Sequence, residues 1–121
     1  MANTIFIEPT TNIVVSIYDG VQTRDTLVAM TNQAKTYISQ LRADQKPVLM
    51  LINTKGITNQ DSGARAMAVE AINSLEYDKM AIFGANVFLK HVLSFMIQLA
   101  LKKETVRYVD NEAEAREWLT Q

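Results

Sequence analysis

The sequence predicts an α/β fold with a mostly parallel central sheet, an antiparallel edge strand and packed helices. Runs rich in β-branched and aromatic residues alternate with segments of helical periodicity, in the order ββαβαβαβα. One run of strand length, Val48–Ile52, is apolar throughout, which is typical of a central strand covered on both faces. The length of 121 residues and the 48% hydrophobic content fit one packed domain, residues 1–121.

Two strands are expected at the start of the chain. Thr4–Ile7 and Ile13–Tyr18 are rich in β-branched and aromatic residues. Residues 8–12 between them have the composition of a turn, so we expect an antiparallel hairpin. Asp19-Gly20 is expected to end the second strand.

An amphipathic helix is expected next, from Thr23 to Arg42. Its apolar residues recur at helical spacing and form one stripe: Leu27, Met30, Ala34, Tyr37, Ile38 and Leu41. The central strand Val48–Ile52 follows, and the polar segment Asn53–Gln60 is expected to be a loop.

The rest of the chain repeats this pattern. We expect a helix over Ser62–Leu75, a strand over Met80–Phe83 and a helix over Asn86–Lys102. A strand over Thr105–Val109 leads to a last helix, which is capped at Asn111. Strands that alternate with helices are joined by right-handed crossovers, so these strands should run parallel.

Composition excludes several classes of function. Twelve Lys and Arg against thirteen Asp and Glu give a net charge of -1 with no basic stripe, so nucleic acid is not an expected partner. The absence of Cys excludes a disulfide framework, a thiolate zinc site and a thiol nucleophile. The single histidine, His91, has no carboxylate at one-turn spacing on its helix to orient it. We therefore expect no catalytic residue, no metal and no cofactor, and a protein that is not an enzyme.

Targeting signals are also absent from the sequence. Residues 1–8 lack the cationic and apolar regions of a signal peptide. No stretch reaches the ~18 apolar residues of a transmembrane segment. The expected location is the cytoplasm.

The segment Thr54–Ala64 is the first candidate for function. It follows the central strand, at the edge where open α/β sheets place their functional loops. Ser62 is expected at a helix N-terminus, where unpaired N–H groups and the helix dipole would stabilise a phosphate. The alternative is structural: Asp61 or Ser62 caps the helix, and Gly63 permits close packing.

Several motifs in this region resemble a known family. Leu51-Ile52-Asn53, Gly56-Ile57-Thr58 and Asp61-Ser62-Gly63 resemble the central motif of STAS domains, the fold of bacterial anti-sigma factor antagonists. The second half resembles the SpoIIAA-like family within that superfamily, through three segments: Met80–Gly84, Val106–Tyr108 and Glu114–Leu119.

The resemblance implies a fold and a role. It implies a STAS-like fold and a regulatory module that binds a protein partner. It makes Ser62 the candidate phosphorylation site. It also implies a switch loop around that serine, made of Asn53, Gly56, Thr58, Asp61 and Gly63.

The expected helix Asn86–Lys102 is the second candidate, because its apolar residues cover far more than the arc of about 100° that a surface helix needs. The surplus could be covered by a second copy of the protein, a membrane surface or a bound apolar ligand, or the helix could be wedged between the sheet and a neighbouring helix. We favour a homodimer, the commonest solution for a small soluble protein.

An apolar small molecule or lipid held in a cleft beneath this helix is the alternative function. STAS-related domains also resemble the CRAL-TRIO lipid-transfer fold, which supports this alternative. The candidate residues for an interface or a ligand cleft are Phe88, Val92, Phe95, Met96 and Leu99.

Overall fold

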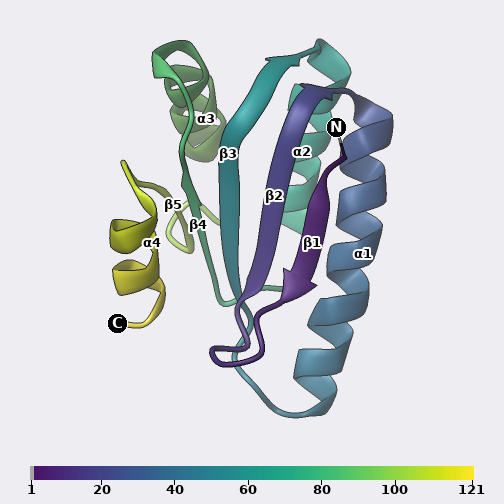
Figure 1. The fold of residues 1–121 in the computed structure, drawn as a ribbon, viewed down its shortest axis with the longest axis vertical. Coiled ribbons are helices and arrows are strands. Elements are labelled where there is room, and N and C mark those ends of the chain that lie inside the picture. The colour runs from purple at the N-terminus through teal and green to yellow at the C-terminus, as the bar shows by residue number, and fades with distance from the viewer. Residues whose placement is uncertain (1) are drawn as a thin grey trace.

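The computed structural model describes residues 2–121, which form a five-stranded sheet and four helices (Figure 1). The elements alternate in the predicted order. Their bounds are β1 Thr4–Ile7, β2 Val14–Gln22, α1 Arg24–Ala43, β3 Leu49–Gln60, α2 Ser62–Ser74, β4 Lys79–Phe83, α3 Val87–Leu99, β5 Val106–Tyr108 and α4 Glu112–Leu119.

The sheet confirms the predicted α/β class. Its strands lie in sequence order, β1-β2-β3-β4-β5. β1 pairs antiparallel with β2 at one edge, with Ile5 opposite Ser16. The other three pairs are parallel. β3 is therefore the central strand, as its apolar first half predicts.

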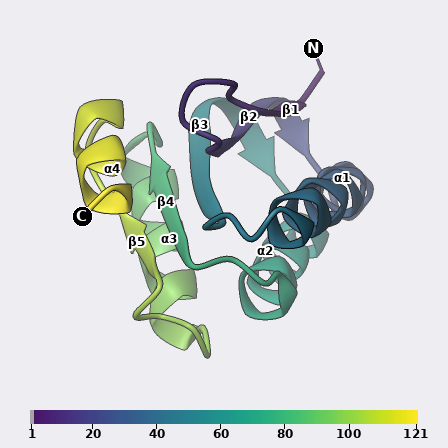
Figure 2. The same cartoon turned by 90° about the horizontal axis from the view of Figure 1, so that it is seen from below.

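The helices cover both faces of the sheet. Figure 2 shows α1, α2 and α3 on one side and α4 on the other. Alternate side chains of β3 point to opposite faces of the sheet. Met50 and Ile52 pack in the core beneath α1, whereas Leu51 packs with Trp118 of α4. This alternation is the two-residue period of a strand buried on both faces.

Each helix in the described part of the chain begins after a polar capping residue. The side-chain oxygen of that residue accepts a hydrogen bond from the backbone N–H three positions on, which satisfies one of the unpaired donors of the first turn. The capping residues are Thr23, Asp61, Asn86 and Asn111.

Two sequence expectations about the centre of the sheet are wrong. The segment Asn53–Gln60 is not a loop, because β3 continues to Gln60. β2 likewise does not end at Asp19-Gly20 but runs to Gln22. The two extensions pair with each other, from Asp19 opposite Gly56 to Gln22 opposite Gln60, with register shifts on the way. Gly20 permits one of these irregularities with a φ of 85°.

α3 is shorter than the expected helix. It ends at Leu99, because Ala100 is extended with a ψ of 146°. The next residues turn back towards the end of α2: the Leu101 N–H bonds Asn73 Oδ1 at 2.8 Å, and Lys102 Nζ bonds the Leu75 carbonyl at 2.7 Å. Within residues 2–121, no helix has the length and apolar content needed to cross a bilayer.

Candidate functional site

The predicted switch residues lie on strand β3 and at the start of α2. Asn53 Oδ1 accepts a hydrogen bond from the Lys55 N–H at 2.9 Å. Thr54 is buried and donates to the Phe83 carbonyl at 2.8 Å. Thr58 is exposed on the extended part of the strand. These three residues therefore belong to a paired strand and not to a free loop.

Gly56 has a packing role at this position. A Cβ atom there would lie 2.8 Å from the Tyr18 carbonyl oxygen and 2.8 Å from Asp19 Oδ1. The backbones of β2 and β3 therefore approach so closely that a side chain at Gly56 would force one of them to move. The glycine that the sequence places in a switch loop is required by the contact between two strands.

Asp61 caps α2, with Oδ1 2.8 Å from the Ala64 N–H. Ser62 is the first residue of the helix, and its side chain is exposed. Gly63 lies against α1, since a Cβ there would lie 3.3 Å from Arg24 Cβ. The N-termini of α1 and α2 are thus neighbours: Arg24 lies against Gly63 with its guanidinium paired to Glu70 at 3.2 Å, and Arg65 follows Ser62 by three positions on α2.

The five candidate residues on α3 divide into two groups. Phe88, Phe95 and Leu99 face outward, with exposed fractions of 69%, 65% and 59%. Val92 is half-buried and Met96 is buried, and both line a cavity. One side of the helix thus offers an apolar surface, and the other side encloses a space.

The cavity has a volume of about 100 Å³ and lies between α2, α3 and the sheet. Its floor includes Ile52 and Ile82 from the sheet. On α2, three small side chains at helical spacing face it: Ala64, Ala68 and Ala71. Because alanine fills little volume, this stripe leaves open space where larger side chains would close the core.

Tyr18 of β2 also lines the cavity, together with Arg65 near the start of α2. Burial raises the pKa of Tyr18 to about 12 and is the whole cause of that shift. Arg65 donates from Nη1 to the Gln60 carbonyl at 3.3 Å. The phenol is therefore neutral and surrounded mainly by apolar side chains.

Sequence reasoning missed Tyr18, Arg65 and the cavity role of the alanine stripe. The sequence carries a signal for the stripe, because Ala64, Ala68 and Ala71 recur at one-turn spacing and so share one face of their helix. No local pattern could show that α3 and the sheet leave a space next to these alanine residues. His91, which the sequence places on this helix, is exposed on α3.

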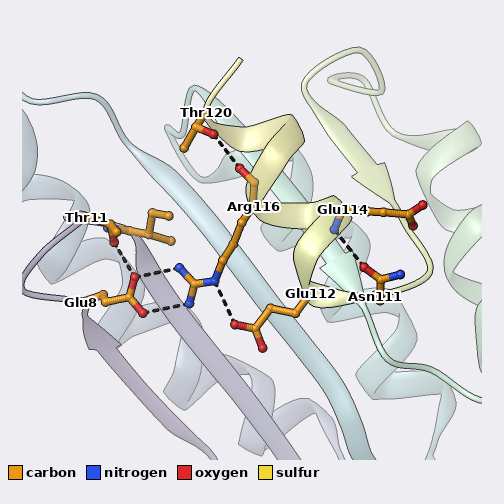
Figure 3. Close-up of polar contacts among 8 residues, drawn as sticks. Glu8, Thr11, Asn111, Glu112, Glu114, Arg116 and Thr120 are labelled. Atoms are coloured by element: carbon orange, nitrogen blue, oxygen red, sulfur yellow. Dashed lines mark hydrogen bonds and ion pairs between the residues drawn. The ribbon is translucent and has the colours of Figure 1, made fainter.

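α4 is fixed to the opposite face of the sheet by an ion pair (Figure 3). Arg116 donates two hydrogen bonds of 2.8 Å to the two carboxylate oxygens of Glu8, and Thr11 donates to the same carboxylate at 2.6 Å. These bonds lower the pKa of Glu8 from 4.5 to about 2. Glu112 accepts a third bond from Arg116, at 2.8 Å. The pair joins the β1–β2 turn to the last helix.

Comparison with known proteins supports the fold. No family model and no curated protein matches the sequence. A protein of the DUF3478 family with a SpoIIAA-like fold, from Shewanella loihica PV-4, matches with a TM-score of 0.70 and 14% identity, over 98% of this chain and 93% of that chain. The anti-sigma factor antagonist SpoIIAA in its unphosphorylated form matches with a TM-score of 0.66 and 14% identity, over 96% and 94%. The chain therefore has a SpoIIAA-like fold.

Proposed function

We propose that this protein is a cytoplasmic, non-enzymatic regulatory module that binds a protein partner. The observation that carries the proposal is the exposed apolar surface of α3, which includes Phe88, Phe95 and Leu99, on a fold shared with an anti-sigma factor antagonist. A contiguous apolar surface of this kind is typical of an interaction site. Among residues 2–121, no three His, Cys, Asp or Glu side chains are grouped to hold a metal ion.

Phosphorylation at Ser62 is the proposed switch of this module. The side chain is exposed at the first position of α2, so a kinase could reach it. Unpaired N–H groups of the first turn and the helix dipole would stabilise the phosphate. Arg65, three positions further along the same helix, would add positive charge nearby, whereas Asp61 would oppose it. The phosphate would change the charge of one end of the molecule without disturbing the core.

Ser62→Asp should weaken binding to the partner by tenfold or more, because it places a negative charge at the start of α2, which we propose the partner also contacts. Calorimetry with an anti-sigma kinase from the same organism would measure the affinity, and phosphopeptide mapping would show the modification of the wild type. Ser39→Asp, which adds the same charge to an exposed position of α1, is the control. Unmodified Ser62 together with unchanged affinity of the variant would rule out the switch.

A homodimer formed through α3 is the proposed resting assembly. Wild-type protein at micromolar concentration should then sediment at twice the 13.6 kDa chain mass. Phe95→Glu should give a folded monomer, since a charge is tolerated at this exposed position of one chain but not in an apolar interface. Gln33→Glu on the exposed side of α1 should leave the dimer intact. Monomeric wild-type protein would contradict the proposal.

Binding of a small apolar molecule is a second candidate function. The cavity of about 100 Å³ favours it, because close-packed interiors contain few spaces larger than a water molecule. Val92 and Met96 would contact the ligand from α3. One side of α3 would then contact the ligand, and the other side would contact a protein partner.

A further inference from the structure

The Tyr18 hydroxyl differs in its bonding from the buried polar side chains that line the cavity between α2, α3 and the sheet. Three of those side chains bond within the protein. Gln22 Nε2 donates to Asn3 Oδ1 at 3.0 Å, Thr31 Oγ1 to the Leu27 carbonyl at 2.7 Å, and Thr54 Oγ1 to the Phe83 carbonyl at 2.8 Å. The Tyr18 hydroxyl makes no hydrogen bond within residues 2–121, and since no fully buried side-chain oxygen or nitrogen there lacks a partner, this hydroxyl is accessible to a water molecule.

Tyr18 is half-buried, yet burial raises its pKa to about 12. These two observations agree if its accessible surface faces the cavity rather than bulk water, and Tyr18 does line the cavity. A phenol with so high a pKa keeps its proton at neutral pH and is a hydrogen-bond donor there. Because the hydroxyl is accessible, water can accept its hydrogen bond in the free protein, and the oxygen of a bound ligand would take the place of that water.

We propose that the Tyr18 hydroxyl selects the ligand of this cavity, and that the ligand is a small apolar molecule carrying a carbonyl or carboxylate oxygen. The inference rests on the second candidate function above. The apolar part would contact Ile52, Ile82 and the alanine stripe, and the oxygen would accept the hydrogen bond from Tyr18. An apolar cavity of about 150 Å³ holds benzene, so the smaller space of about 100 Å³ suits a short chain of a few carbon atoms.

Two probe molecules of similar shape distinguish the contribution of the hydrogen-bond acceptor to affinity from that of the apolar part of the ligand. Butanone carries a carbonyl oxygen where 2-methyl-1-butene, which has the same number of heavy atoms, carries a methylene group. Their affinities for wild-type protein and for Tyr18→Phe would be measured by NMR titration of the amide resonances. Because the cost of removing each probe from water is the same for both proteins, it cancels in the ratio of affinities. The ratio of butanone to 2-methyl-1-butene affinity should fall by about three- to tenfold in Tyr18→Phe, which is the effect of one lost neutral hydrogen bond.

A second pair of variants locates the binding. Ala68→Leu fills the space beside α2 and should abolish binding of both probes, whereas Ala66→Leu on the exposed side of the same helix should leave both affinities unchanged. An unchanged affinity ratio in Tyr18→Phe would overturn the role of the hydroxyl and leave apolar binding standing. Failure of both probes to bind the wild type would overturn the role of the hydroxyl and the ligand-binding function together.

Discussion

Gly56→Ala is expected to lower the free energy of unfolding by about 1–3 kcal/mol, the usual cost of forcing extra volume into a packed site. The new Cβ would meet the Tyr18 carbonyl oxygen and Asp19 Oδ1 at 2.8 Å, and Asp19 Cα at 3.2 Å. Two of these neighbours are backbone atoms of β2, which cannot move without disturbing the parallel pairing. Urea unfolding of the two proteins at pH 7, followed by circular dichroism, measures the difference.

Thr58→Ala is the matched control for this experiment. Thr58 lies on the same extended part of β3, but its side chain is exposed. Its removal should change the free energy of unfolding by no more than about 0.5 kcal/mol. If both variants unfold at the wild-type urea concentration, the close approach of β2 and β3 does not constrain the fold.

Glu8→Gln is expected to destabilise the protein by about 1–2 kcal/mol at pH 7, because it removes the charge that Arg116 binds through two hydrogen bonds. The estimate is at the low end for charged hydrogen bonds because the side chains are 23% and 33% exposed. The folded pKa of about 2 lies below the ordinary 4.5. The ionised carboxylate therefore stabilises the fold fully above pH 4.5, and this contribution is lost as the pH falls from 4.5 towards 2.

Unfolding free energies of wild-type protein and Glu8→Gln, measured from pH 7 to pH 2.5, test this dependence. The difference between the two proteins should be constant above pH 5 and should shrink steadily below pH 4.5. Glu117→Gln, on the exposed side of the same helix α4, should show no such dependence. A difference that stays constant down to pH 2.5 would mean that the pKa of Glu8 is not lowered in the folded protein and that its charge does not stabilise the fold.

Much of the fold could be predicted from local pattern. The continuous apolar run at Val48–Ile52 correctly indicated the central strand, and the apolar stripe of α1 correctly indicated its buried side. Asn111 caps the last helix as predicted. These features depend on the periodicity and chemistry of neighbouring residues, so the sequence carries them directly.

The site could be predicted only in part. Ser62 does begin a helix, and the apolar surplus of Asn86–Lys102 does leave Phe88 and Phe95 exposed. The polar composition of Asn53–Gln60 is typical of a loop, and the prediction of a loop there is wrong. The segment is a strand because residues 19–22 of β2 lie beside it and pair with it. Because residues 19–22 are more than thirty positions away, the sequence around Asn53–Gln60 does not show that they pair with it.

The sequence by itself determined the order of the elements, the central position of β3, the start of α2 near Ser62 and the excess of apolar side chains on α3. Each follows from residues within a few positions of one another. Only the tertiary structure decided that Asp61 is the cap of α2, that Gly56 lets β2 and β3 approach closely, that Glu8 holds α4, and that Tyr18 lines a cavity with Ala68. Those features depend on which distant segments come together and on the volume left between them, and a pattern along the chain does not encode either one.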